Sequence, residues 1–193
     1  FIEKLPFLDL TVLDYSSDLI GRGAQLAIQF GLTNVSFHQG DLYDLSKVFP
    51  SKRFDGLISL QTLSWLPNYS EPLLEMIKLR PKWIGFSSLF YEGYISARIE
   101  ITESKRSRSS FYNTYSLPEL KIFCEQHGYI VDRFQRFQIP VNIPKPSNPD
   151  VMSTYTLELE ESKAGDSGLL QISGPLLLNW YFVMLKEISE INE

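Results

Sequence analysis

Hydrophobic and polar positions over the first ninety residues alternate between short apolar runs and longer segments with one apolar face. The apolar runs predict strands at 10–14, 35–40, 54–60 and 83–90. Between them, segments 18–30 and 70–79 carry apolar residues at helical spacing, and Ser16 is a good N-cap for the first helix. Strands and helices that alternate with short links are typical of parallel βαβ units.

The segment 91–114 interrupts this pattern. It is aromatic at both ends and has a basic, serine-rich middle at 105–110, which indicates a loop or a lid. The basic middle is either a solvated loop or an anion site for an acidic substrate. After it, Ser116 and Glu119 have the spacing of a capping box, which predicts a helix to Gly128 and then a strand over 129–139.

The last third of the chain is rich in predicted strands. Prolines 140, 144, 146 and 149 indicate a stiff excursion. Segments 155–160 and 169–173 alternate around a turn at 163–168 and predict a β-hairpin, and 180–185 reads as a buried final strand. We therefore expect one α/β domain over residues 1–193, with three layers, a mostly parallel sheet, a hairpin insertion near the C-terminus and an antiparallel last strand.

Charge and cysteine content exclude several classes of protein. The 193 residues can bury a sizeable core, and a net charge of −5 argues against a general nucleic-acid binder. Cys124 is the single cysteine, so neither an intrachain disulfide nor a cysteine-based metal site is expected. No apolar run reaches the ~18 residues of a membrane-spanning helix and no signal peptide is visible, so we expect a cytoplasmic protein without a membrane partner.

Carboxylates stand at the ends of the first two predicted strands, at Asp14 and Asp41. In open α/β sheets, ligands lie outside the carboxyl ends of the strands, where an acidic residue can accept hydrogen bonds from both hydroxyls of a ribose. The alternative for Asp14 is a purely local role, in capping the following helix or shaping the turn.

Four motifs in order carry a resemblance to a known family. They are Asp14-x-Ser16-x-x-Leu19-Ile20 with Ala24; Val35-x-Phe37-x-Gln39-Gly40-Asp41-Leu42; Phe54-Asp55-Gly56-Leu57-Ile58-Ser59 followed by Leu63 and Trp65-Leu66; and Trp180-Tyr181-Phe182-Val183. From Leu10 to Lys186, the chain resembles the class I S-adenosylmethionine-dependent methyltransferases. The resemblance implies a Rossmann-like methyltransferase sheet and S-adenosylmethionine as cofactor.

The resemblance also implies which residues bind this cofactor. Asp14 would bind the ribose hydroxyls, Asp41 would accept from the adenine amino group, and Leu42 would pack near the ring. Ser59, Leu60 and Gln61 would lie along the methionine moiety, and Tyr15 completes the expected cofactor-binding set.

One part of the family pattern is missing from the sequence. The glycine-rich first motif would lie before residue 1, and its strand normally lies between the Asp14 strand and the Phe54 strand. A sheet without that strand would leave backbone groups unpaired, at about 1–3 kcal/mol each when buried. Either upstream residues are absent here, or the chain does not bind the cofactor as the family does.

Aromatic and charged residues around the fourth strand are candidates for binding a small-molecule acceptor. The expected set is Trp65, Tyr91, Glu92, Tyr94, Arg98, Tyr112 and Tyr115. Methyl transfer from a sulfonium mainly needs alignment of the reactants, which can supply about 7–11 kcal/mol of the barrier, so no catalytic residue is assigned. Glu92 is either a base for an acceptor hydroxyl or a solvated surface residue. Both histidines, His38 and His127, are expected to have structural roles.

The expected function is methyl transfer to a small molecule that fold-level analogy does not name. Two alternatives stay open. One is a non-catalytic scaffold with a degenerate cofactor site. The other is a nicotinamide-dependent enzyme, which shares the acidic residue at a strand end; the β-rich end of the chain with its reversed last strand argues against it.

Overall fold

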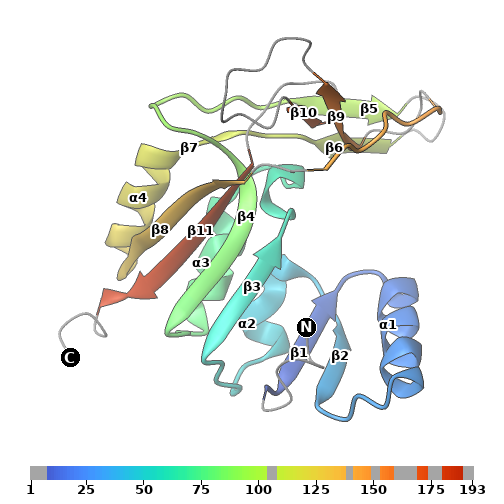
Figure 1. The fold of residues 1–193 in the computed structure, drawn as a ribbon. Coiled ribbons are helices and arrows are strands. Elements are labelled where there is room, and N and C mark those ends of the chain that lie inside the picture. The colour runs from blue at the N-terminus through green and yellow to red at the C-terminus, as the bar shows by residue number, and fades with distance from the viewer. Residues whose placement is uncertain are drawn as a thin grey trace. The chain divides into compact units, whose positions relative to one another are not determined.

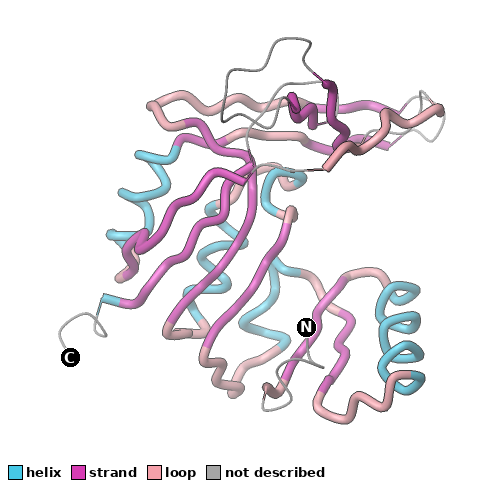
Figure 2. The backbone as a smooth tube through the Cα atoms, in the orientation of Figure 1, coloured by secondary structure: helices cyan, strands magenta, loops and turns pink. Residues whose placement is uncertain are grey.

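The computed structural model describes residues 8–103, 108–137, 141–148, 153–158, 169–173 and 180–188. The chain divides into two compact units. The first unit takes its described residues from Phe1–Arg53 and Glu71–Arg80, and the second takes them from Phe54–Ser70 and Pro81–Glu193. Figure 1 labels the helices and strands, and Figure 2 shows the same chain coloured by secondary structure. A single domain over all 193 residues stays a prediction.

The first unit contains a parallel βαβ arrangement, as the sequence predicts. Strands β1 (Leu10–Asp14) and β2 (Val35–Gln39) pair in parallel, and helix α1 (Ser17–Gln29) connects them. Ser16 caps α1, because its hydroxyl accepts from the Leu19 N–H at 3.4 Å. Gly31, with φ +64°, follows the helix in the left-handed conformation that ends many helices.

Helix α1 approaches β2 closely at a glycine. A Cβ atom at Gly23 would lie 2.6 Å from Cε1 of Phe37, so only glycine fits against this ring. Glycine inside a helix costs about 1 kcal/mol relative to alanine. The close packing of helix on strand explains why a helix-weakening residue stands here.

The rest of the first unit follows β2. A 3₁₀ turn, η2 (Leu42–Asp44), leads into the short helix α2 (Leu45–Val48), and α3 (Ser70–Lys78) contributes buried Leu73 and Met76. The Glu75 carboxylate of α3 accepts from the N–H of Ser46 at 3.0 Å and from its hydroxyl at 2.6 Å. These bonds tie the start of α2 to α3.

The main sheet of the second unit has the strand order β3-β4-β11-β8. Its strands are β3 (Gly56–Leu60), β4 (Trp83–Tyr91), β8 (Tyr129–Phe137) and β11 (Trp180–Glu187). Strand β3 is parallel to β4, whereas β11 is antiparallel to both β4 and β8, so the predicted reversal of the last strand is confirmed. A short strand, β7 (Tyr115–Ser116), adds to β4 in parallel.

Helix α4 (Leu117–Gln126) follows β7 and buries Leu120 and Cys124. Its N-cap is Ser116, whose hydroxyl accepts from the Glu119 N–H at 3.3 Å, as the capping-box spacing predicts. In a capping box, the Glu119 carboxylate would in turn accept from the backbone N–H of Ser116, but here it does not do so directly. The hydroxyl of Ser96 donates to the Glu119 carboxylate at 3.1 Å and accepts from the Ser116 N–H at 2.9 Å, so a serine distant in sequence bridges the two groups.

The prediction of an irregular loop over 91–114 is wrong for much of this segment. Strands β5 (Glu100–Glu103) and β6 (Arg108–Phe111) form an antiparallel pair. The reason is burial: Ile99 and Ile101 pack against a core cluster of Leu89, Tyr112 and Trp180. The middle of the basic run, 104–107, lies outside the described residues.

The predicted C-terminal hairpin strands are confirmed as an antiparallel pair, β9 (Thr154–Glu158) and β10 (Leu169–Ser173). Thr156 joins β9 to the proline-rich segment, because its N–H donates to the Ile143 carbonyl at 2.9 Å and its hydroxyl accepts from the Ile143 N–H at 2.7 Å. Residues 1–7, the predicted turn at 163–168 and residues 138–140 and 149–150 lie outside the described residues.

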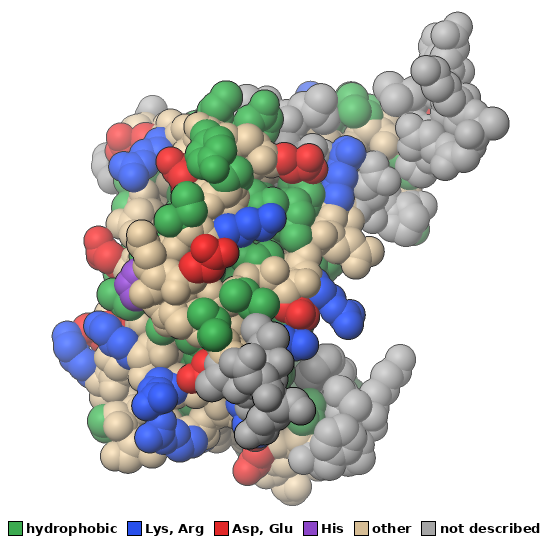
Figure 3. Space-filling view, turned by 90° about the vertical axis from the view of Figure 1, so that its left-hand side faces the viewer, with side chains coloured by type: hydrophobic (Ala, Val, Ile, Leu, Met, Phe, Trp, Pro, Cys, Tyr) green, Lys and Arg blue, Asp and Glu red, His purple; other side chains and the backbone are tan. Residues whose placement is uncertain are grey.

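The surface near α4 and β8 mixes charged and hydrophobic groups. Figure 3 shows this side, where acidic and basic side chains lie beside apolar ones. Strand β8 is at an edge of the sheet in the described part of the chain, and Arg133, Gln135 and Arg136 on it are exposed. Charged residues on an edge strand oppose pairing with another chain. Among the described residues, no helix has the length and apolar character needed to cross a membrane.

Candidate functional site

Asp14 ends β1 and shapes the turn into α1. Its Oδ1 accepts from the Ser16 N–H at 2.8 Å, which sets Ser16 in its capping position. No partner of Oδ2 occurs among the described residues. The carboxylate is therefore fixed through one oxygen, while the other can accept a hydrogen bond from a ligand.

Asp41, two residues beyond β2, is held in the same way. Its Oδ1 accepts from the Tyr43 N–H at 3.0 Å, and the side chain is exposed. The N–H of Gly40 donates to the Asp14 carbonyl at 3.0 Å, which joins the backbones of the two strand ends. A Cβ atom at Gly40 would lie 2.9 Å from Leu13 and 3.0 Å from Val48, so this joint is tightly packed.

The two carboxylates thus lie at the same edge of a parallel strand pair, as the sequence predicts, since Asp14 pairs with Gln39 in the register. Tyr15 is 69% exposed and its carbonyl accepts from the Gln39 side chain at 3.1 Å, so its backbone is fixed while its ring is open. Leu42 is half-buried. Two acceptor groups with apolar side chains beside them fit the hydroxyls, the amine and the ring of a nucleoside.

The three residues expected along the methionine moiety belong to the second unit, at the carboxyl end of β3. Ser59 is buried, Leu60 is 59% exposed, and Gln61 has φ +56°. The N–H of Gln61 donates to both the carbonyl and the hydroxyl of Ser87, each at 3.0 Å. A non-glycine residue with positive φ costs about 1–3 kcal/mol, and such residues cluster at ligand sites.

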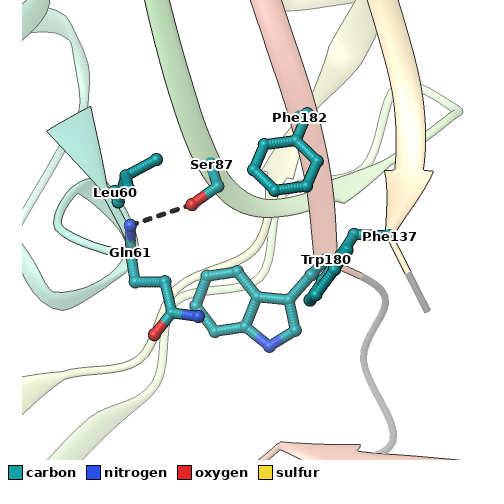
Figure 4. Close-up of a pocket in the computed structure, with 6 residues that line it drawn as sticks. All are labelled: Leu60, Gln61, Ser87, Phe137, Trp180 and Phe182. Carbon is teal, nitrogen blue, oxygen red and sulfur yellow. Dashed lines mark hydrogen bonds between the residues drawn. The ribbon is translucent and has the colours of Figure 1, made fainter. Parts of the chain in front are cut away.

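A pocket of about 240 Å³ opens beside Gln61 (Figure 4). We refer to it as the aromatic pocket; it is lined by Leu60, Gln61, Ser87, Phe137, Trp180 and Phe182. Sequence reasoning did not identify four of these residues as part of a site: Ser87, Phe137, Trp180 and Phe182. The strand register brings them together, because Phe182 pairs with Ser87 and Trp180 pairs with Phe137. The alternation of Trp180 and Phe182 on one strand was the only available signal.

Most residues expected to bind the acceptor are exposed. Trp65, Tyr91 and Tyr94 are 37%, 50% and 73% exposed, and Glu92 and Arg98 are also at the surface. The Tyr181 hydroxyl donates to Oε1 of Glu92 at 2.9 Å, a contact that the sequence did not indicate. Glu92 is therefore held in place by a buried tyrosine. Acceptor binding by these residues stays a prediction.

Tyr112 and Tyr115 differ from this exposed set, because they are only 2% and 3% exposed. The Tyr115 hydroxyl donates to the carbonyls of Leu63 and Leu66 at 3.0 and 3.2 Å. Burial raises the pKa of Tyr115, so it stays protonated and acts as a donor. Both tyrosines offer almost no accessible surface to an acceptor in this structure, and Tyr115 supports the loop that follows β3.

Asn113 is a second support of this loop that sequence reasoning missed. It is fully buried, its amide donates to the Leu66 carbonyl at 2.8 Å, and its Oδ1 accepts from the Ile99 N–H at 3.0 Å. Its backbone N–H also donates to the Ser64 carbonyl at 2.7 Å. A single asparagine therefore joins the loop after β3 to the strand pair β5–β6.

The histidines contribute packing contacts. The His38 ring lies 5.1 Å from the Phe49 ring, and Nδ1 of His127 lies 2.7 Å from the Phe123 carbonyl. In the described part of the chain, no three His, Cys, Asp or Glu side chains come together as metal ligands could.

Comparisons with solved structures identify the fold. The chain is similar to the 1,6-didemethyltoxoflavin-N1-methyltransferase of Burkholderia thailandensis, solved with S-adenosylhomocysteine (16% identity, TM-score 0.54, 93% of this chain and 61% of that one). It is also similar to the magnesium protoporphyrin IX methyltransferase of Synechocystis PCC 6803, solved with the same ligand (10%, 0.53, 92% and 63%). A third similar structure is the [4+2]-cyclase SpnF (14%, 0.50, 67% and 45%).

The chain thus spans less than two thirds of each of these three proteins, and the low identities indicate a shared fold alone. No curated protein sequence matches the chain. A family model described as "Methyltransferase domain" matches residues 4–106, which is more than half of the 193 residues and includes Asp14, Asp41 and Gln61. With its mixed α/β fold and mostly parallel strands, the chain belongs to this family of methyltransferase domains.

Proposed function

We propose that this protein is an S-adenosylmethionine-dependent methyltransferase that acts on a small molecule. The observation that carries the proposal is the pair of carboxylates, Asp14 and Asp41, at the carboxyl ends of the neighbouring parallel strands β1 and β2. Each is fixed by one backbone N–H and keeps a second oxygen for a ligand. Both lie in the segment that matches the methyltransferase family.

The described residues fit the chemistry of this cofactor. S-adenosylmethionine would supply an activated methyl group bound to a positively charged sulfur. The uncommitted oxygen of Asp14 can accept from ribose hydroxyls, and Asp41 can accept from the adenine amine. Leu42 and the exposed Tyr15 ring offer apolar contact to the base. Ser59, Leu60 and Gln61 would contact the methionine moiety.

A small-molecule acceptor is supported by two structural neighbours whose names state small acceptors, 1,6-didemethyltoxoflavin and magnesium protoporphyrin IX. One structural neighbour is named a [4+2]-cyclase, so the fold by itself does not establish methyl transfer. Measured cofactor binding therefore decides between a methyltransferase and a scaffold with a degenerate site.

No residue is assigned to proton removal from the acceptor. Glu92 accepts a hydrogen bond from Tyr181, but Tyr181 alternates with Trp180 and Phe182 along β11 and therefore lies on the other face of the sheet from the aromatic pocket. Alignment of the acceptor would still provide the larger part of the rate, about 7–11 kcal/mol for a well-oriented pair of reactants.

The test is the affinity for S-adenosylmethionine, measured by calorimetry on the full-length protein. Hydrogen bonds to a charged group contribute about 1.5–3 kcal/mol, so Asp14→Ala should weaken binding by about 10- to 100-fold. Asp18→Ala is the matched control, since it removes an acidic group from the first turn of α1 without touching the strand end. If the wild type does not bind S-adenosylmethionine, the proposed function is wrong. If Asp14→Ala binds it as tightly as the wild type does, the assignment of Asp14 to the ribose is wrong.

A further inference from the structure

We propose that the aromatic pocket is the acceptor subsite and that it binds one planar ring carrying an oxygen or nitrogen substituent, as a phenol does. This inference rests on the proposed function, because it names the substrate class of the same site. It concerns residues of the second unit alone: Leu60, Gln61, Ser87, Phe137, Trp180 and Phe182.

The walls of the aromatic pocket are rings held in fixed positions. Figure 4 shows Phe182 and Trp180 on β11 and Phe137 on β8 around the opening. The Phe137 and Phe182 rings meet edge to face, with centroids 5.1 Å apart and an interplanar angle of 71°. Trp180 is 3% exposed and belongs to the buried core cluster, whereas Phe182 is 44% exposed. A rigid inner wall and an open outer ring suit the stacking of a flat ligand.

The polar groups of the aromatic pocket are few and well placed. Ser87 is 6% exposed, and its Oγ accepts from the Gln61 N–H at 3.0 Å. Because a hydroxyl also carries one proton, and no acceptor for this proton occurs among the described residues, Ser87 can donate to a ligand. The side-chain amide of Gln61 borders the same space (Figure 4). An apolar site with a small number of polar groups is typical of small-molecule recognition.

The size of the aromatic pocket limits the ligand. Its volume is about 240 Å³. An apolar cavity of about 150 Å³ in another protein binds benzene, so this space accommodates one substituted ring. Leu60 and Gln61 belong both to this pocket and to the strip proposed to contact the methionine moiety. A ring bound here would therefore lie next to the group that carries the methyl.

Phenol is the probe, and ligand-observed NMR on the full-length protein gives its dissociation constant, with toluene and cyclohexanol for comparison. Phenol should bind in the millimolar range and more tightly than cyclohexanol, which lacks a flat face. Phe182→Ala should weaken phenol binding about tenfold, which corresponds to about 1.4 kcal/mol. Ser87→Ala should weaken binding of phenol but not of toluene, and the Gln61 N–H keeps its bond to the Ser87 carbonyl.

Ile58→Ala is the matched control, because Ile58 lies on the same face of the sheet, is 52% exposed and does not line the pocket. If phenol does not bind, or if Phe182→Ala and Ile58→Ala bind it equally well, the inference is wrong. The cofactor is titrated separately. If S-adenosylmethionine binds and phenol does not, the proposed acceptor subsite is wrong and the proposed function stands. If phenol binds and S-adenosylmethionine does not, the proposed methyltransferase function is wrong and the pocket remains a site for aromatic rings.

Discussion

The loops that follow β1 and β2 are held in a different way from the loop that follows β3. In the first unit, Asp14 and Asp41 each fold their own loop, by accepting from an N–H two residues later. In the second unit, the loop after β3 is fixed by Asn113 and Tyr115, whose bonds to Leu63 and Leu66 span 47 to 52 residues of sequence. The first arrangement is local and the second is not.

Under the proposed function, this difference means that the ligand-binding residues of the first unit contribute little to folding, whereas those of the second unit depend on it. A carboxylate that shapes only its own turn can be replaced with little effect on the rest of the fold, because few other contacts depend on it. The position of Gln61 depends on a strand pairing with Ser87 and on a loop anchored by buried side chains. We therefore expect changes in the second unit to affect stability and ligand binding together.

The largest effect is expected from Asn113→Ala. The change removes an amide that is fully buried and leaves the Ile99 N–H without this partner, whereas the Leu66 carbonyl keeps the Tyr115 hydroxyl. A buried group without a partner costs about 1–3 kcal/mol and the lost bond to Leu66 about 0.5–1.5 kcal/mol, so the free energy of unfolding should fall by about 2–4 kcal/mol, measured by urea denaturation. Thr62→Ala is the control in the same loop, since the Thr62 hydroxyl donates to the carbonyl of Leu60, two residues away. Similar losses in both variants would remove the distinction between local and distant anchors.

The next largest effect tests a contact between residues distant in sequence within the first unit, where Glu75 of α3 holds the start of α2. Glu75→Ala should lower the free energy of unfolding by about 1.5–3 kcal/mol, because the Ser46 N–H and hydroxyl lose a charged acceptor. Glu75→Gln should cost less, since an amide oxygen can still accept both bonds. If Glu75→Ala were as stable as the wild type, distant anchors would not matter in this unit.

The same carboxylate makes stability depend on pH. Burial alone would raise the pKa of Glu75, but hydrogen bonds from Lys78 and Ser46 outweigh it and lower the pKa from 4.5 to about 2. Between these values the unfolded chain binds the proton and the folded chain does not. The stabilisation is therefore complete above pH 4.5 and is lost as the pH falls toward 2. The difference in stability between wild type and Glu75→Gln should narrow over this range in urea titrations.

A smaller effect is expected from Asp41→Asn, which tests whether the strand-end loops of the first unit bind ligand without supporting the fold. An amide oxygen can still accept from the Tyr43 N–H and from an adenine amine, so affinity for S-adenosylmethionine should fall by less than in Asp14→Ala. The melting temperature should stay within about 2 °C of the wild type. A large drop in melting temperature with unchanged affinity would reverse the assignment and make Asp41 a structural residue.

The local arrangement could be predicted from the sequence, and the distant one could not. An apolar run, an aspartate and a capping serine are adjacent in the chain, so Asp14 and Ser16 reveal the strand end and the helix start directly. The strands β5 and β6 were missed because what favours them is the packing of Ile99 and Ile101 on residues far away in sequence. The aromatic pocket was missed for the same reason, since it depends on the register of β11 against two other strands.

The smallest change in stability is expected for two neighbouring serines of β4, Ser87 and Ser88. The Ser87 hydroxyl accepts from the Gln61 N–H, whereas the Ser88 hydroxyl is fully buried and has no hydrogen-bond partner in the described part of the chain. A typical hydrogen bond contributes about 0.5–1.5 kcal/mol, so Ser87→Ala should lower the free energy of unfolding by about this amount. Ser88→Ala should leave it unchanged or raise it by up to about 1 kcal/mol, because it removes a buried polar group that gains nothing from folding. Urea denaturation of both variants measures the difference. If Ser88→Ala is the more destabilised of the two, the network that holds Gln61 extends through both serines, and the loop after β3 is anchored more widely than through Asn113, Tyr115 and Ser87.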